Sequence, residues 1–139
     1  MTRKVREIMS AAPACMAASE SVSAAAKAMK ERGIGTVLVL SGGRLAGLVT
    51  DRDIAIRVLA ENRDPLTTRL DDICSSELAV LSPDDAVETA TRIVRDRAVR
   101  RLPVMADGTP VGVVSTGDLA LDKDERSALS QISAFGPNG

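Results

Sequence analysis

The order of apolar and polar residues predicts a first set of short elements between positions 14 and 60. A brief extended piece, Ala14–Met16, precedes a helix that begins near Val22 and repeats apolar residues at helical spacing. Two apolar runs follow as strands, Val37–Leu40 and Leu45–Val49, and a second helix covers Ile54–Ala60. This half of the chain is therefore predicted to fold in the order β-α-β-β-α.

The same pattern returns in the second half. The extended piece is Ala79–Leu81, and the two strands are Leu102–Met105 and Pro110–Val114. The segment Ser82–Asp85 supplies a cap, a first-turn proline and acidic groups near a positive helix end, so it predicts the start of the helix that carries Val87. The second half thus predicts the same order of elements as the first.

Glycines mark the turn inside each predicted strand pair. Gly42–Gly43 and Asp107–Gly108 favour the positive φ angles of a tight hairpin. Pro103 interrupts the strand of the second half, and its missing N–H group predicts that this strand lies at an edge of its sheet or that Pro103 lies at a strand start.

The two halves are copies of one unit. Shifted by 65 positions, the chain matches itself without a gap, Val5–Ile54 on Leu70–Leu119. Most of the identical positions are glycines and core-type residues, with one carboxylate, and such a match predicts a duplicated structural unit. The fold class is predicted as α/β (α+β), with two β-α-β-β-α repeats that bury a shared core because each half is marginal alone.

The predicted boundaries follow from the copies. The first motif covers residues 5–61, the second covers 69–125, and a C-terminal extension covers 126–139. The extension is predicted to continue the last helix through Ser127–Ile132 and to fray over Phe135–Gly139, so it is partly disordered.

Composition narrows the function classes. The 139 residues are 45% apolar with a net charge of −1, so no basic field attracts nucleic acid, and the apolar runs are far too short to span a membrane. No signal peptide is visible, which predicts a cytoplasmic protein. Cys15 and Cys74 are interpreted as two buried, inert thiols of a reducing cytosol, a redox-linked pair being the alternative, and without histidine no metal site is expected.

One polar motif begins the second helix of each copy. Thr50-Asp51-Arg52-Asp53 and Ser115-Thr116-Gly117-Asp118 both place a hydroxyl three positions before a carboxylate. One interpretation is a capping box, which serves only the helix start. The other is a ligand site, because a helix start favours anions and a carboxylate accepts the two hydroxyl groups of a ribose.

Arginines near this motif are candidates for binding phosphate. Arg52, Arg100 and Arg101 carry guanidinium groups that match phosphate oxygens. The alternative interpretation for the arginines at positions 95 to 101 is a solvated helix end.

Two longer stretches carry a family resemblance. Residues 33–39 with 47–54, and residues 99–104 with 112–119, resemble paired CBS motifs, the tandem arrangement called a Bateman module. The resemblance covers positions 5 to 120 and is nearest to stand-alone actinobacterial CBS proteins of the hypoxic response protein type. It implies a pseudo-twofold module with two clefts, which in many relatives take AMP, ADP, ATP, NAD or S-adenosylmethionine.

The resemblance also implies which residues serve each cleft. Thr50, Arg52 and Asp53 would hold ribose and phosphate in one cleft, with Leu48, Ala79 and Val80 around the base. The other cleft would use Ser115, Gly117 and Asp118, with Val113, Ala14 and Cys15 around the base. Arg100 occupies a position where relatives place a basic residue near phosphate, whereas the first copy has Gly35 there, so the two clefts are predicted to be unequal.

The function predicted on this basis is a regulatory module that senses an adenosine-containing ligand and alters dimer or partner contacts. The alternative is a scaffold whose clefts bind no nucleotide. Catalysis is not expected, because the sequence lacks histidine, a Walker-type loop and a clear nucleophile–base pair. No cofactor is required, a homodimer is implied by the family, and the regulated protein partner is unknown.

Overall fold

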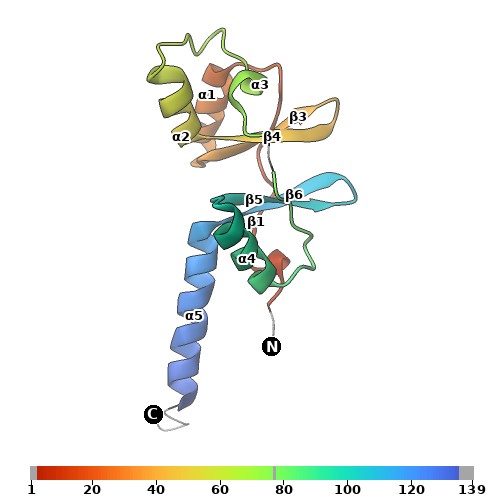
Figure 1. The fold of residues 1–139 in the computed structure, drawn as a ribbon, viewed down its shortest axis with the longest axis vertical. Coiled ribbons are helices and arrows are strands. Elements are labelled where there is room, and N and C mark those ends of the chain that lie inside the picture. The colour runs from red at the N-terminus through yellow and green to blue at the C-terminus, as the bar shows by residue number, and fades with distance from the viewer. Residues whose placement is uncertain (1–2, 77, 135–139) are drawn as a thin grey trace. The chain divides into compact units, whose positions relative to one another are not determined.

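The computed structural model describes residues 3–76 and 78–134, with the backbone alone for residues 126 and 128–134. The predicted frayed end, Phe135–Gly139, lies outside the described residues. The chain forms two compact units (Figure 1). The repeat-1 unit comprises the described residues between 12 and 78 together with residues 107–110, and the repeat-2 unit comprises residues 3–11, 79–106 and 111–134 of the described chain.

The repeat-1 unit holds a three-stranded sheet in the order β2-β3-β4. β2 runs parallel to β3, and β3 runs antiparallel to β4 through the tight turn at Gly42–Gly43, where both glycines have positive φ. The element bounds are β2 (Cys15–Ala17), α1 (Val22–Arg32), β3 (Thr36–Ser41), β4 (Arg44–Thr50), α2 (Asp51–Ile54), the π-helix η2 (Ala55–Leu59) and α3 (Leu70–Ile73).

The helices of this unit pack on one face of its sheet. Val37, Val39 and Val49 of the strands are fully buried in one cluster with Val58 of η2. The periodic apolar face predicted for the first helix supplies Val22, Ala25 and Met29 of α1 to the same cluster, and Leu70 and Ile73 of α3 complete it. An aliphatic core of this kind fixes where β4 ends and α2 begins.

The repeat-2 unit contains the equivalent elements. Its sheet has the order β1-β6-β5, and β1 pairs antiparallel with β6. The predicted hairpin turn at Asp107–Gly108 is confirmed by positive φ at both residues. The bounds are the 3-10 helix η1 (Val5–Glu7), β1 (Ser10–Ala11), α4 (Val87–Arg97), β5 (Arg101–Ala106), β6 (Thr109–Ser115) and α5 (Thr116–Ala134).

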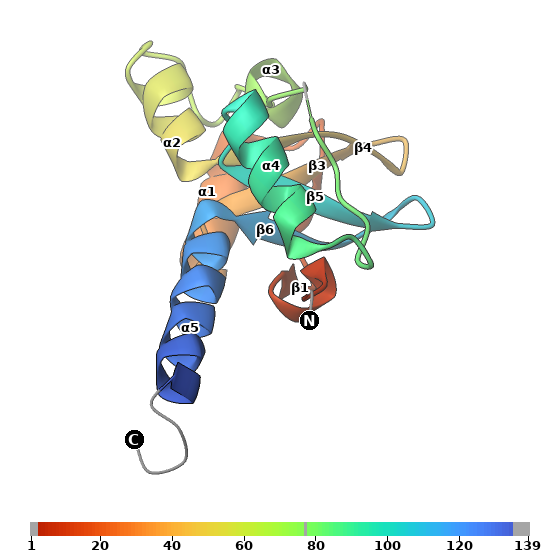
Figure 2. The same ribbon diagram turned by 60° about the horizontal axis from the view of Figure 1, so that its bottom comes forward.

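A second aliphatic cluster lies between this sheet and α4 (Figure 2). Ala90 of α4 is buried against Leu102 and Val104 of β5 and Val114 of β6. Val5, from the N-terminal segment, is fully buried in the same cluster. α5 confirms the predicted C-terminal helix; it begins at the end of β6 and runs away from the sheet of its own unit (Figure 1).

The N-terminal segment of each repeat pairs with the last strand of the other repeat. Ser10 pairs with Val113 of β6, and Ser75 pairs with Leu48 of β4. The 65-position offset relates these two pairings, since 10 and 48 become 75 and 113. The compact units therefore cut across the motif ranges of 5–61 and 69–125, which describe the repeats only along the sequence.

The predicted helix start at Ser82–Asp85 is wrong. These residues form a turn in which the Asp85 carboxylate accepts the backbone N–H of Ser82 (2.8 Å), and α4 begins at Val87 after an extended Ala86. The N-terminal segment decides the boundary, because the carbonyl oxygen of Arg3 accepts the backbone N–H of Val87 (3.0 Å). A helix start inside the turn would lose this pairing.

Pro103 lies inside β5, at the edge of the three named strands, as predicted for a residue without an N–H group. At the equivalent position in repeat 1, Leu38 donates its N–H to the carbonyl of Ala14 (2.8 Å). Pro103 cannot make that bond to Ala79. Hence the first extended piece forms a strand in repeat 1, whereas in repeat 2 the pairing is a single bridge from Leu81 to Val104.

Candidate ligand-binding motifs of the two repeats

The Thr50–Asp53 motif is a complete capping box. The Thr50 hydroxyl accepts the backbone N–H of Asp53 (3.1 Å), and Oδ2 of Asp53 accepts the backbone N–H of Thr50 (2.8 Å). Both residues are half-buried, and Arg52 between them is exposed. The predicted capping role is confirmed, and it orients the Asp53 carboxylate at the end of β4.

The Ser115–Asp118 motif has the same geometry. The Ser115 hydroxyl accepts the Asp118 N–H (3.1 Å), and Oδ2 of Asp118 accepts the Ser115 N–H (2.8 Å). Gly117 is exposed in the first turn of α5. Each carboxylate uses one oxygen, Oδ2, to accept the backbone N–H at the start of its helix. The second oxygen can accept a hydrogen bond from a ligand, so capping and ligand binding do not exclude each other.

Arg100 belongs to the repeat-2 motif. Its carbonyl oxygen accepts the backbone N–H of Thr116, the first residue of α5, at 3.0 Å. The exposed Arg100 side chain therefore starts beside the Ser115–Asp118 box. Arg101 is half-buried in β5, whereas Arg95 and Arg97 are exposed at the end of α4, as expected for a solvated helix end.

The equivalent backbone bond in repeat 1 joins Gly35 and Asp51. The Gly35 carbonyl accepts the Asp51 N–H at 3.0 Å. A Cβ added to Gly35 would stand 2.9 Å from Oδ2 of Asp51, so the Asp51 carboxylate fills the space that a side chain at position 35 would need. Comparing the two copies in the sequence shows that repeat 1 has Gly35 where repeat 2 has Arg100. That the Asp51 side chain fills the space beside Gly35 follows only from this contact.

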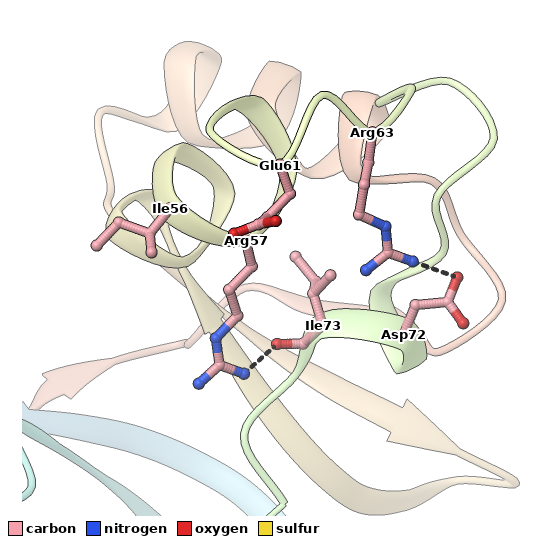
Figure 3. A pocket seen from close by; sticks show the side chains of 6 residues that line it. All are labelled: Ile56, Arg57, Glu61, Arg63, Asp72 and Ile73. Atoms are coloured by element: carbon pink, nitrogen blue, oxygen red, sulfur yellow. Dashed lines mark hydrogen bonds and ion pairs between the residues drawn. The ribbon is translucent and has the colours of Figure 1, made fainter.

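Arg57 links the repeat-1 motif to a pocket (Figure 3). Its Nε lies 3.8 Å from Oδ1 of Asp53, and its Nη1 donates to the Ile73 carbonyl at 3.0 Å. The pocket has a volume of about 510 Å³, and its remaining walls come from Ile56, Glu61, Arg63 and Asp72. Sequence reasoning missed Arg57, although its spacing of four residues from Asp53 on one helix was a readable signal.

The repeat-2 unit has an acid at the position equivalent to Arg57. Asp122 has a side chain only 2% exposed, and its Oδ1 accepts from Nη1 of Arg3 at 2.7 Å. Arg3 also lies 3.4 Å from Glu125. The helix after each box therefore contacts the N-terminal segment next to or within the other repeat, Arg57 at Ile73 and Asp122 at Arg3, through side chains of opposite charge in the two copies. No sequence signal indicated the Arg3–Asp122 pair.

The residues expected around the base occupy matching positions. Leu48 is buried on β4, and Val113 is half-buried on β6. Ala14 and Ala79 are buried and their successors, Cys15 and Val80, are exposed. Ala14 and Cys15 lie in one unit with Leu48, and Ala79 and Val80 lie in the other with Val113, so the shared clefts named above stay a prediction.

The sheet topology separates the two thiols. Cys15 pairs with Leu38, Leu38 with Leu48, and Leu48 with Ser75, the neighbour of Cys74. Three strand spacings of ~4.8 Å put Cys15 and Ser75 roughly 14 Å apart, far beyond the ~7 Å that a disulfide tolerates between Cα atoms. Both cysteines are free, Cys15 is exposed and Cys74 is half-buried, so the expected burial of both thiols is wrong for Cys15. A redox-linked pair within one unit is therefore wrong.

Comparison with known proteins identifies the family. The CBS domain model matches residues 5–60 and 70–121, so the chain belongs to the CBS domain family as a tandem pair. The CBS domain-containing protein YhcV of Bacillus subtilis is 34% identical over 93% of this chain and 94% of its own length. Hypoxic response protein 1 of Mycobacterium tuberculosis is 30% identical over 94% of this chain and 92% of its own length.

Solved structures confirm the fold. Hypoxic Response Protein I, crystallised with two coordinated zinc ions, matches with a TM-score of 0.73 at 30% identity, over 86% of this chain and 98% of that one. A hexameric CBS-CP12 protein from bloom-forming cyanobacteria matches with a TM-score of 0.80 at 30% identity, over 86% of this chain and 67% of that one. The predicted α/β pair of CBS repeats is confirmed. CBS-domain proteins are in general regulatory, ligand-sensing modules.

Metal-ligand groups and membrane-spanning helices were both sought among the described residues. Within residues 3–76 and 78–134, no group of three or more His, Cys, Asp and Glu side chains is placed to hold a metal ion. Among the same residues, no helix is long and apolar enough to cross a membrane.

Proposed function

We propose that this chain is a regulatory module, not a catalyst, that binds an adenosine nucleotide at the Ser115–Asp118 motif of repeat 2. The observation that carries the proposal is the backbone bond from Thr116 to Arg100, because it fixes the backbone of Arg100, whose side chain is exposed, beside a capping box. Asp118 would accept the ribose hydroxyls, while Ser115 and Arg100 would bind phosphate. Val113, on the same strand as Ser115, would lie beside the base, as the family resemblance implies.

Ligand binding would regulate by shifting a conformational equilibrium. A nucleotide that binds one arrangement of the module better favours that arrangement by no more than its differential affinity. The hexameric state named for the CBS-CP12 relative supports self-association here, and we propose a cytoplasmic homodimer as the assembly that responds. Sedimentation at micromolar concentration as a monomer would contradict the dimer.

A thermal-shift panel with AMP, ADP, ATP, NAD and S-adenosylmethionine tests the ligand. A ligand at about 100 to 1,000 times its Kd should stabilise the fold by roughly 3–4 kcal/mol. Two variants separate binding from capping. Asp118→Asn keeps an oxygen for the Ser115 N–H but removes the charge, and Arg100→Gly copies the residue that repeat 1 has at this position.

Both variants should fold and lose most of the ligand-induced shift. Arg95→Ala, at an exposed arginine that pairs with its neighbour Asp96, is the matched control and should keep it. A wild-type chain that shows neither a melting shift nor heat with any of the five ligands would exclude the proposal and leave the scaffold function.

A further inference from the structure

A pocket of about 510 Å³ lies beside η2 in the repeat-1 unit (Figure 3). It is lined by four charged side chains, those of Arg57, Glu61, Arg63 and Asp72, and by two isoleucines, Ile56 and Ile73. A hollow of this size is within the range that holds a small molecule. All six residues belong to one compact unit, whereas the Ser115–Asp118 motif belongs to the other, so this pocket is a separate candidate site.

The backbone around the pocket has two uncommon features. η2 is a π-helix, whereas the equivalent residues of repeat 2, 120–124, continue the α-helix α5, and π-turns often accompany a functional site. The chain then reverses at Asn62, which has a positive φ of 56°. The N–H of Arg63 donates to the Val58 carbonyl at 2.9 Å, and this turn brings the Arg63 side chain to the pocket wall.

The charged residues of the pocket differ between the two copies. The 65-position offset matches Arg57 with Asp122, Glu61 with Arg126 and Arg63 with Ala128. Asp72 is matched by Glu7, and each of these two carboxylates accepts the backbone N–H three positions earlier, so this acid serves the local turn. The other three charges have no like-charged counterpart in repeat 2, and therefore the repeat fold does not require them.

The two guanidinium groups are held at the pocket but keep donors for a ligand. Arg57 is fixed through Nη1, which donates to the Ile73 carbonyl at 3.0 Å. Arg63 is held more loosely, because its Nη2 lies 3.9 Å from Oδ2 of Asp72, which is longer than a hydrogen bond. The fork of Arg63 can therefore bind a carboxylate through two N–H groups.

The charge balance of the pocket indicates the class of ligand. Its two arginines are balanced by Glu61 and Asp72, so a free dianion such as phosphate would meet carboxylates as well as guanidinium groups and gain little. A zwitterion can place its carboxylate on an arginine and its ammonium group on an acid. Figure 3 shows the Glu61 and Arg63 side chains on either side of the Ile73 side chain, so opposite charges flank an apolar floor.

We propose that this pocket binds a free amino acid with an aliphatic side chain, as a second ligand site independent of the nucleotide motif. Arg63 would hold the carboxylate, and the Glu61 carboxylate would accept hydrogen bonds from the ammonium group. The aliphatic side chain would lie against Ile56, which is 45% exposed. Such a ligand would bridge η2 and the α3 side of the pocket and stabilise the repeat-1 unit.

Calorimetric titration with L-leucine, L-isoleucine and L-valine tests the site. L-Leucine should bind at one site per chain. Leucinamide lacks the carboxylate and N-acetyl-L-leucine lacks the ammonium group, so each should bind about tenfold or more weakly. Amide NMR spectra should show the leucine-induced changes at residues 56–63 and 72–73.

Two variants test the charged residues. Arg63→Met keeps an apolar side chain of similar length, Glu61→Gln keeps the shape, and each should lower leucine affinity about tenfold or more. Both positions are exposed, so both variants should keep the melting temperature of the wild-type chain. Arg44→Met, at an exposed arginine of β4 outside the pocket, is the matched control and should leave leucine affinity unchanged.

The nucleotide response is a separate readout. Arg63→Met and Glu61→Gln should leave the nucleotide-induced melting shift unchanged, and Asp118→Asn should leave leucine binding unchanged. Leucine affinity equal to wild type in both pocket variants, or no binding of any of the three amino acids at millimolar concentration, would overturn this inference and leave the proposed function standing. Leucine binding without any nucleotide response would do the reverse.

Discussion

Gly47 lies directly under the backbone of Ser75, and a Cβ at position 47 would stand 2.6 Å from the Ser75 carbonyl oxygen. The same Cβ would be 2.8 Å from Sγ of Cys74. This close approach lets the segment after α3 pair with β4, and Gly112 of β6 makes the equivalent approach to Ser10 of β1, where a Cβ would stand 3.0 Å from the Ser10 carbonyl oxygen. The two strands that end at the candidate motifs, β4 and β6, therefore each need a glycine so that the neighbouring segment can pair with them.

Gly47→Ala should lower the free energy of unfolding by about 1–3 kcal/mol, because the backbone of Ser75 must move to admit a methyl group. Urea denaturation measures the change. Gly117→Ala is the control, since its nearest new contact, Oγ of Ser115, is at an ordinary 3.5 Å and alanine favours a helix. An alanine at position 47 as well tolerated as one at position 117 would contradict the close approach.

Ser115→Ala should destabilise the repeat-2 unit by about 1 kcal/mol, because the Asp118 N–H loses its side-chain acceptor at the start of α5. Thr50→Ala should cost a similar amount at α2. Thermal unfolding with and without nucleotide separates stability from binding. Ser115→Thr keeps the hydroxyl and should retain wild-type stability; an equal loss in the threonine variant would show that the hydroxyl is not the cause.

Arg3→Met should destabilise the fold by about 1–3 kcal/mol, because it removes a charge-assisted hydrogen bond to the buried Asp122 while keeping an apolar side chain of similar length. Chemical denaturation measures the loss. Arg6→Met removes the exposed pair with Asp84 and should have a much smaller effect. Equal effects of the two substitutions would show that burial of Asp122 adds nothing.

Partial desolvation of the sulfur raises the pKa of both cysteine thiols above the ordinary 9.0, although Cys15 as a residue is exposed, and the nearby Asp71 carboxylate adds to the effect at Cys74. The fold therefore favours the protonated thiols, and their contribution to stability is present below pH 9.0 and is lost as the pH rises through the raised values. Between pH 8 and pH 10.5 the melting temperature of the wild-type chain should fall further than that of Cys15→Ser/Cys74→Ser. Parallel curves for the two proteins would contradict the raised pKa values.

Mild oxidation should leave Cys15 and Cys74 without an intramolecular disulfide, because three strand spacings separate them in the sheet of the repeat-1 unit. Mass spectrometry of peptides under non-reducing conditions detects the link. Recovery of the Cys15–Cys74 peptide pair from the monomer fraction would contradict the strand order.

Much of each repeat followed from the sequence. The apolar periodicity located α1, α4 and the four long strands, and the glycine pairs located both hairpin turns. Even the capping geometry of Thr50–Asp53 and Ser115–Asp118 was predicted, because a box of this kind involves neighbours in the chain. Capping hydrogen bonds and the periodicity of apolar side chains depend on residues that are close in the sequence, and therefore short segments are enough to predict them.

Long-range contacts decided the rest. The start of α4 at Val87 depends on the distant Arg3, and Asp122 is held by the same residue, more than a hundred positions away. The fixed Asp51 carboxylate over Gly35 and the separation of the two thiols likewise depend on which strands and turns lie side by side. The sequence by itself determined the duplicated elements, whereas only tertiary packing decided which segments pair across repeats and what the Asp51 and Asp122 carboxylates contact, because those contacts join residues that no local pattern relates.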